Sequence, residues 1–378
     1  MKKNSSPYRV RFVNYSLQYQ KLKKQIDRVI TDVLERGDLI LRSDVEVFEK
    51  KLADFIGSKF ALGLNSGTDA LFLSLKAIGI DQGDEVITVS HTFVASIATI
   101  VQAGATPILV DVGDDFVMDV SQIEKVITAK TKAIIPVHLN GRLVEMDKLM
   151  NLAQKYHLLV IEDAAQALGA KIKINSQWRL AGSIGVTGCF SFYPAKILGC
   201  FGDGGGLTTN NPQIAEKIRL WRDHGQKTKR EIVCYGWNSR LDNLQAAVLN
   251  IKFKYLEQWI ERRREIARIY TRGLKNIAHI KLPVPPDANP RFFDVFQNYV
   301  LRAQKRDELF QFLKEKGVET LIKDPIPNHL QPLLELSHFH LPVSEQLAKE
   351  VISLPMYPEL TDGEIEYVIN CVCQFYQK

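Results

Sequence analysis

One lysine of this sequence stands where its amine can act as a nucleophile. Lys196 ends the stretch FSFYPAK, in which aromatic residues and a proline follow an apolar run that is typical of a β-strand. An amine beside apolar surface loses hydration, which lowers its pKa and enlarges the neutral fraction that attacks carbonyl carbons. The pattern therefore favours imine chemistry at Lys196, although a lysine taken alone is usually only a surface charge.

A carboxylate in a comparable position follows another apolar run. Asp163 in IEDAAQ comes just after residues 158–161, and a carboxylate there costs free energy unless a cation or hydrogen-bond donors pair with it. The ring nitrogen of pyridoxal 5'-phosphate (PLP) would be a suitable partner, because a nearby carboxylate keeps that nitrogen protonated and the ring can then draw electrons from a substrate. A structural strand-end cap explains Asp163 equally well.

Two further polar segments stand between a strand pattern and a helix pattern. In NSGTD, Gly67 permits a tight turn, and the helix start that follows offers N–H groups and the Thr68 hydroxyl to a phosphate. An ordinary helix N-cap is the simpler explanation of that segment alone. The segment GWNSRLD, with Asn238 and Arg240, opens a long helical pattern and by itself indicates only a helix start.

Helix and strand patterns alternate through the first two thirds of the chain, and they must position these side chains. Helices are predicted at 21–36, 45–56, 68–77 and 146–156, and strands at 60–64, 85–89, 107–111, 133–137, 158–162 and 189–192. Such alternation indicates an α/β fold with a mostly parallel central sheet and helices on both faces. Ligands of such sheets gather beyond the carboxyl ends of the strands, where the polar segments stand.

The remainder of the chain predicts a second, smaller α/β unit. An amphipathic segment at 244–272 contains the charged run 261–265, which is most simply a solvated helix face, and a proline-rich connector follows at 281–291. Further strand and helix signals lie at 298–302, 307–315, 345–352 and 362–375. We predict a large domain at 1–255, with an N-terminal arm at about 1–20, and a small C-terminal domain at 256–378.

Composition excludes several classes of protein. The chain has 378 residues, 46% of them hydrophobic, and its net charge of only +6 is spread along the sequence, so no nucleic-acid partner is expected. Five scattered cysteines fit reduced thiols and a cytoplasmic location. No signal sequence or membrane-spanning run is expected. His338 and His340 lack convergent Cys, Asp or Glu residues, so we predict no metal.

Taken together and in order, the motifs resemble those of the DegT/DnrJ/StrS family of sugar aminotransferases. The resemblance runs from about residue 13 to the C-terminus and rests on NSGTDAL, SHTFVAS, IEDAAQALGA, FSFYPAK with GDGG, WNSRLDNLQAA, HLQP and SLPMYPELT. It implies a PLP-dependent enzyme of fold type I that works as a homodimer.

The resemblance also assigns cofactor residues. Lys196 matches the family lysine that forms a Schiff base with PLP, and Asp163 matches the acid paired with the ring nitrogen. Gln166 matches the side chain near the ring hydroxyl, and Phe93 falls where an aromatic ring stacks on the cofactor.

The phosphate of the cofactor has its own expected ligands. Gly67, Thr68 and Ser191 match phosphate-binding residues of the family, and Asn238 matches an asparagine that reaches the phosphate of the neighbouring subunit. The last assignment implies active sites shared across one dimer interface.

Candidates on the substrate side are Arg240, His329 and Tyr193. Arg240 would pair with a donor carboxylate or a substrate phosphate, while a structural ion pair with Asp242 or another acid competes equally. His329 matches the histidine of the HLQP motif, and a buried structural histidine explains it about as well. His91, which precedes the stacking segment, is a weaker candidate.

Two segments depart from the commoner family pattern. Asn140-Gly141-Arg142 stands where many relatives have Tyr-Gly-Gln, and Tyr357 stands where many have histidine. Both segments are expected to border the substrate, so these changes weaken any transfer of substrate identity and leave the cofactor residues unaffected.

The resemblance implies a two-stage transamination. L-Glutamate would leave its amine on the cofactor as pyridoxamine phosphate (PMP), and a keto sugar, expected to be a nucleotide-linked keto-deoxyhexose, would then take that amine while Lys196 moves the proton. The amino sugar would serve lipopolysaccharide or other glycan synthesis. Dehydratase relatives have histidine in place of the lysine, so Lys196 argues against that branch. A keto cyclitol substrate and a non-catalytic PLP-binding protein remain as alternatives.

Overall fold

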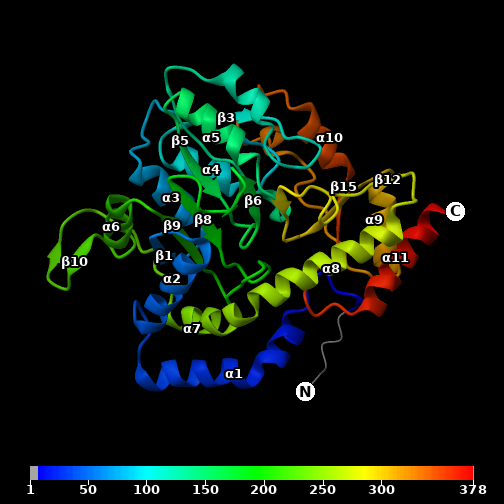
Figure 1. Cartoon of the computed structure of the whole chain (residues 1–378), viewed down its shortest axis with the longest axis horizontal. Helices are drawn as coiled ribbons and strands as arrows, with labels where there is room; N and C mark the ends of the chain where they lie inside the picture. The colour runs from blue at the N-terminus through cyan, green and yellow to red at the C-terminus, as the bar shows by residue number, and fades with distance from the viewer. Residues whose placement is uncertain (1–6, 378) are drawn as a thin grey trace.

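A seven-stranded sheet forms the centre of the molecule (Figure 1), whose computed structural model describes residues 7–377. Residues 1–6 of the predicted N-terminal arm and residue 378 lie outside the described residues. In spatial order the strands are β1 (Phe60–Leu64), β9 (Gly205–Thr209), β8 (Thr187–Ser191), β5 (Leu159–Asp163), β4 (Thr131–Ile134), β2 (Glu85–Val89) and β3 (Thr106–Val110). Only β9 runs antiparallel to its neighbours. The predicted fold class is confirmed.

Helices cover both faces of this sheet, because side chains of alternate strand residues enter different cores. On β5, Val160 packs into one hydrophobic cluster and Ile161 into the other. The first cluster also takes residues from α2 (Ser43–Ile56), α5 (Met146–Lys155) and α7 (Asn243–Lys252). The second cluster takes residues from α3 (Gly67–Ala77), α4 (Ala95–Gln102) and α6 (Pro212–Trp221). Helix α1 (Tyr15–Arg36) lies along α7 and adds Leu22 and Ile26 to the first cluster.

A smaller antiparallel sheet organises the last third of the chain. It contains β12 (Ile280–Lys281), β14 (Tyr299–Ala303) and β15 (Val351–Leu354), with α9 (Arg306–Glu315), α10 (Pro342–Glu350) and α11 (Asp362–Tyr376) around it. Short 3-10 helices lie at η1 (Val120–Val126), η2 (Leu139–Gly141) and η4 (Asn328–Leu330). A further three-stranded sheet contains β6 (Lys171–Ile174), β7 (Gln177–Leu180) and β13 (Phe292–Phe293). A two-stranded sheet is the protruding hairpin of β10 (Gln226–Thr228) and β11 (Glu231–Ile232).

The amphipathic segment predicted at 244–272 forms two helices. Helix α7 ends at Lys252, the 3-10 turn η3 (Phe253–Tyr255) follows, and α8 (Leu256–Leu274) crosses the molecule diagonally (Figure 1). Trp259, near the start of α8, belongs to the core of the large sheet, whereas Tyr270, near its end, belongs to the core around the small sheet. One helix therefore joins both cores, and the domain division at 255/256 stays a prediction.

The charged run 261–265 is not the solvated face that its sequence indicates, because two of its arginines are buried. Arg263 donates from Nη1 to the main-chain oxygens of Phe296 (3.3 Å) and Met356 (3.0 Å). Arg264 donates from Nη1 to the Asp294 carbonyl at 2.8 Å. Guanidinium groups carry five donors each, so carbonyls inside a protein can stabilise them where solvent is absent. The two side chains hold the segment around 294–297 against α8.

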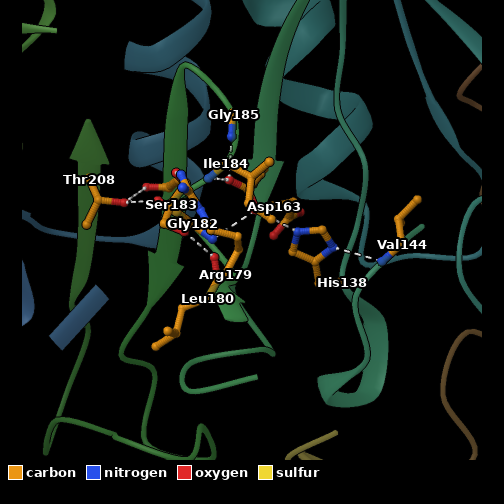
Figure 2. A network of polar contacts seen from close by, with 12 residues as sticks. His138, Val144, Asp163, Arg179, Leu180, Gly182, Ser183, Ile184, Gly185 and Thr208 are labelled. Carbon is orange, nitrogen blue, oxygen red and sulfur yellow. Dashed lines mark hydrogen bonds and ion pairs between the residues drawn. The ribbon is translucent and has the colours of Figure 1, made fainter. Parts of the chain in front are cut away.

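A buried carboxylate fixes the loop between β7 and β8 next to the end of β5. Glu162 is fully buried, and its Oε1 accepts from the N–H groups of Ile184 and Gly185, both at 2.7 Å. Its Oε2 accepts from the Gly182 N–H at 2.9 Å and lies 3.0 Å from His138 Nε2. Figure 2 shows this loop and the His138 ring on either side of the β5 end.

Hydrogen bonding also sets the tautomer of His138. The Val144 N–H donates to Nδ1 at 3.3 Å, so Nδ1 carries no hydrogen and Nε2 carries the one donated to Glu162. Glu162 thus accepts four hydrogen bonds in a site without water access, which is the arrangement that makes a buried carboxylate tolerable.

We expect Glu162→Gln to lower the free energy of unfolding by about 2–4 kcal/mol. Whichever carboxylate oxygen becomes an NH2 group, that group would face two donors, since each oxygen accepts from two. Urea unfolding followed by circular dichroism measures the change. Glu216→Gln is the matched control, because Glu216 is an exposed partner of Arg219 on α6. Equal, small effects of both substitutions would contradict this account.

Candidate active site

The carboxyl ends of β1, β5 and β8 and the loop after β2 surround a cavity of about 600 Å³. Eight of the residues singled out in the sequence line it: Gly67, Thr68, Phe93, Asp163, Gln166, Ser191, Tyr193 and Lys196. A second cavity of about 180 Å³ adjoins the first, and both are bordered by Phe93, Gln166 and Lys196. The polar segments around Gly67, Asp163 and Lys196, which are far apart in the sequence, therefore meet in one place.

Lys196 and Asp163 form the electrostatic pair of this cavity. Burial lowers the pKa of the Lys196 amine below its usual value, and the negative charge of Asp163 opposes that shift. The amine is therefore easier to deprotonate than that of a surface lysine, and its protonated form still has a counter-ion in the cavity. This combination suits a group that must be a nucleophile at one moment and a proton carrier at another.

Both oxygens of the Asp163 carboxylate are held in place. The Ser96 hydroxyl donates to Oδ2 at 2.7 Å, and the Ala165 N–H donates to Oδ1 at 3.2 Å. Ser96 is in turn 3.0 Å from the Thr92 hydroxyl oxygen. Each carboxylate oxygen has a further lone pair, so the group can accept another hydrogen bond from a cation in the cavity without losing its orientation.

The Gln166 side chain presents its NH2 group as the free end. Its Oε1 accepts from the Asn140 N–H at 3.1 Å and from Asn298 Nδ2 at 3.2 Å. A main-chain N–H can only donate, so these contacts determine which end of the amide is oxygen. The nitrogen, for which no hydrogen bond is found within residues 7–377, is available to an oxygen of a ligand in either cavity.

The start of α3 forms an anion-binding corner. Ser66 caps the helix by accepting from the Asp69 N–H at 3.0 Å. The preceding N–H groups of Gly67 and Thr68 have no acceptor within residues 7–377, as is usual in a first helical turn. A Cβ atom on Gly67 would lie 2.9 Å from the Cβ of Ser191, so glycine lets the two segments touch. Hydroxyls of Thr68 and Ser191 complete a corner suited to a phosphate.

Phe93 supplies a flat apolar wall. The residue is 64% exposed because its side chain lines the two cavities. An exposed aromatic ring inside a cavity is a stacking surface for a flat ligand. These groups together fit a phosphorylated aromatic ring with a charged ring nitrogen: the Phe93 wall, the Asp163 carboxylate, the Gln166 amide and the phosphate corner. The residues present are therefore compatible with PLP.

Gln297 holds the backbone on both sides of Lys196, a role that the sequence did not indicate. Its Nε2 donates to the Ala195 carbonyl at 2.7 Å, and its Oε1 accepts from the Ile197 N–H at 2.9 Å. The residue is buried and comes from the segment that Arg263 anchors from α8. The contact joins positions 100 residues apart, and no local pattern in the sequence could have revealed it.

Three of the expected residues lie elsewhere. Asn238 is exposed and does not line the cavity. Arg240 forms an ion pair with Asp223 at 2.7 Å, the structural alternative left open by the sequence, with a different acid from Asp242. His329 is fully buried, with Nδ1 2.7 Å from the Ser90 hydroxyl and Nε2 3.4 Å from Glu345, as a structural histidine would be.

The weaker sequence candidate His91 lines the smaller cavity. Burial lowers its pKa to about 4, with the charge of Asp111 opposing the shift, so the ring is neutral at neutral pH. A neutral imidazole there can exchange hydrogen bonds but brings no positive charge for a substrate anion.

The two departures from the family pattern have different surroundings. Asn140 lines the smaller cavity, whereas Arg142 forms ion pairs with Asp115 at 3.1 Å and Asp294 at 2.8 Å. Tyr357 is buried.

Residues 7–377 contain neither a cluster of metal ligands nor a helix that could span a membrane. No three His, Cys, Asp or Glu side chains in this range are grouped so that they could hold a metal ion. None of the helices in the same range combines the length and apolar character needed to cross a bilayer.

Comparison with known proteins places this site in a family. The model of the DegT/DnrJ/EryC1/StrS aminotransferase family matches residues 20–373. A dTDP-3-amino-3,4,6-trideoxy-alpha-D-glucose transaminase of Streptomyces venezuelae is 40% identical over 98% of this chain and 97% of its own length.

Solved structures agree with the sequence match. DesV of S. venezuelae, solved in complex with a ketimine intermediate, has a TM-score of 0.93 and 39% identity, covering 99% of this chain and all of that one. NtdA of Bacillus subtilis, solved with bound cofactor PMP, has a TM-score of 0.89 and 29% identity, covering all of this chain and 87% of that one. The chain is therefore an aminotransferase of the DegT/DnrJ/EryC1/StrS family.

Proposed function

We propose that this aminotransferase uses PLP, held covalently by Lys196, to transfer an amino group from L-glutamate to a keto sugar. The observation that carries the proposal is the meeting of the Lys196 amine and the Asp163 carboxylate in one cavity beside a phosphate-binding corner. A dinucleotide, metal or nucleic-acid function would not need this combination of groups. An amino-group transfer needs all of them.

Each part of the cofactor has a matching group in the chain. Gly67, Thr68 and Ser191 would bind the phosphate, and Phe93 would pack against the ring. The Gln166 NH2 group would donate to the ring hydroxyl oxygen, since its carbonyl oxygen is already bound to the protein. Asp163 would accept from the ring nitrogen through a lone pair that neither Ser96 nor Ala165 uses.

When bound, PLP supplies an electron-accepting ring that stabilises negative charge on the substrate carbon. The chain supplies the proton transfers. Nζ of Lys196 would take the proton from the substrate carbon, acting as a base, and would then deliver it as an acid to the second carbon of the exchange. Its lowered pKa brings its proton affinity closer to neutral pH, which favours both directions of transfer. Asp163 keeps the opposing positive charge in the cavity.

The keto sugar is proposed to be a nucleotide-linked keto-deoxyhexose. Support comes from the S. venezuelae relative, which is named for a dTDP-linked amino sugar and matches almost the whole chain. The cavity volume of about 600 Å³ lies within the range of sites that enclose a cofactor or small ligand. A cytoplasmic location is proposed as well, and five free cysteines support it.

A homodimer is proposed because Asn238 is too exposed to serve its own cavity. Asn238 follows a strongly exposed apolar segment, in which Tyr235 is 98% and Ile232 69% exposed. Exposed aromatic and β-branched residues of this kind favour a protein interface. Across such an interface the Asn238 amide would donate to the cofactor phosphate of the second subunit.

Lys196→Ala is expected to remove the visible absorption of covalently held PLP and to abolish transamination, because both the covalent bond and the proton transfer are assigned to its amine. Absorption spectra of the PLP-loaded protein and a glutamate-dependent amination assay measure both effects. Lys349→Ala, at an exposed position on α10, is the control and should behave as wild type. Wild-type turnover in Lys196→Ala would rule out the assignment.

Asp163→Asn should leave covalent PLP binding intact and lower the rate of the glutamate half-reaction by about 100-fold or more. The amide has nearly the same shape but no charge, so it cannot keep the ring nitrogen protonated. Stopped-flow spectroscopy with L-glutamate measures the rate. An Asp163→Asn rate within a factor of about two of wild type would mean that the carboxylate is only a strand-end cap.

Mixing two inactive variants tests the shared active site. Asn238→Asp places a negative charge where a phosphate is expected and should inactivate the enzyme, as Lys196→Ala does. A hybrid dimer of the two has one site with both an intact Lys196 and an intact Asn238, so a randomly mixed sample should recover about a quarter of wild-type activity. No recovery, with hybrid formation verified by mass spectrometry, would show that Asn238 does not act across the interface.

A further inference from the structure

A short segment crosses the cavities from the small sheet to the large one, and we call residues 322–327 the strap. On one side Leu321 is paired with Ser353 of β15, through N–H to carbonyl contacts of 3.1 Å and 2.8 Å. On the other side the Asn328 side chain donates to the Ser90 carbonyl at 2.9 Å. Anchors at both ends leave the strap little freedom, so the side chains that it carries are presented at fixed places.

Lys323 of the strap borders both cavities. It shares this position with Lys196, Phe93 and Gln166, the three other residues that line the larger and the smaller cavity alike. Lys323 therefore stands where the two cavities meet, close to the amine that carries the chemistry. The cofactor assignments account for Lys196, Phe93 and Gln166 and give Lys323 no role.

The ammonium group of Lys323 lacks a partner. Within residues 7–377 the structure contains no hydrogen bond and no ion pair from Lys323, and the adjacent Asp324 forms none with it either. A partly buried cation without an acceptor costs free energy, which a bound anion would recover. The buried side chains of Arg263 and Lys252, by contrast, donate to main-chain oxygens.

Lys323 remains positively charged under ordinary conditions. Burial and the nearby positive charge of Lys196 lower its pKa to about 8, while Asp324 opposes the shift. At neutral pH the protonated form therefore predominates. With Lys196 bound to the cofactor, Lys323 would be the primary ammonium group left beside the reacting atoms.

We infer that Lys323 binds a carboxylate of the amino donor. The inference rests on the proposed function, in which an amino acid reacts at Lys196. The α-carboxylate of every amino acid is bonded to the carbon that carries the reacting nitrogen, so it must come to rest near the Lys196 amine. The cofactor phosphate has its own corner at Gly67, and a neutral sugar ring offers no anion at this distance. A charge-assisted hydrogen bond from Lys323 fits the donor.

Lys323→Met tests the inference, because methionine keeps the length of the side chain and removes the charge. In the PLP-loaded enzyme the concentration of L-glutamate that half-saturates the spectral change should rise about 10- to 100-fold, while the limiting rate changes less. Binding of glutarate, which has both carboxylates of glutamate and no amine, should weaken by a similar factor in calorimetry. The second measurement reports the anion site without any turnover.

Further arms locate the carboxylate and control for charge. If Lys323 binds the α-carboxylate, L-glutamine should show the same rise as L-glutamate; if it binds the side-chain carboxylate, only L-glutamate should. Lys323→Arg should recover at least part of the affinity lost in Lys323→Met. Lys349→Met removes an exposed lysine from α10 and should leave both measurements unchanged.

Unchanged glutamate saturation and unchanged glutarate binding in Lys323→Met would overturn the inference, whether or not the sugar half-reaction is affected. Failure of the proposed function looks different, because the wild-type protein itself would then show no bound PLP and no spectral response to L-glutamate. The inference would also be contradicted if Lys323→Arg lost as much binding as Lys323→Met. Such a result would show that the substitutions disturb the packing of the strap and that the positive charge is not what matters.

Discussion

The site depends on placing an amine and a carboxylate together at one cavity, where burial removes much of their hydration. Burial lowers the pKa of Lys196, and the Asp163 charge limits that shift, so the amine is reactive without being stripped of its counter-ion. Neither effect would be sustained at a protein surface, where solvent would screen the charges. The parallel sheet makes the pairing available because β5 and β8 end at the same edge.

Supports from three directions maintain this pairing. The Glu162 carboxylate fixes the loop beside the end of β5 by accepting hydrogen bonds from N–H groups of that loop. The Ser96 hydroxyl holds the Asp163 carboxylate. Gln297 clamps the residues on either side of Lys196. Arg263 binds the carbonyl of Gln297 from α8 and so links the clamp to the helix that joins both cores. These surrounding contacts leave the Lys196 and Asp163 side chains little freedom to move.

The sequence predicted the large sheet well because its strands are short apolar runs that end in polar residues. The strand predicted at 60–64 and the one at 85–89 coincide with β1 and β2. Asp163 could be named for the same reason, because it directly follows such a run, whereas Ser191 was named through the resemblance to the family. Arg263 was misplaced, because a charged run in a helical pattern resembles a solvated face and only tertiary contacts reveal its buried carbonyl partners.

What the sequence could not predict comes from the last third of the chain. Gln297 and Lys323 reach the cavity through turns and a strap, where no periodicity marks which side chain points inward.

Sodium borohydride reduction of the PLP-loaded protein, followed by peptide mass spectrometry, tests the central claim most directly. We predict that the cofactor is found on Lys196. Attachment to Lys323, the other amine of the cavity, or to any other lysine would contradict the account.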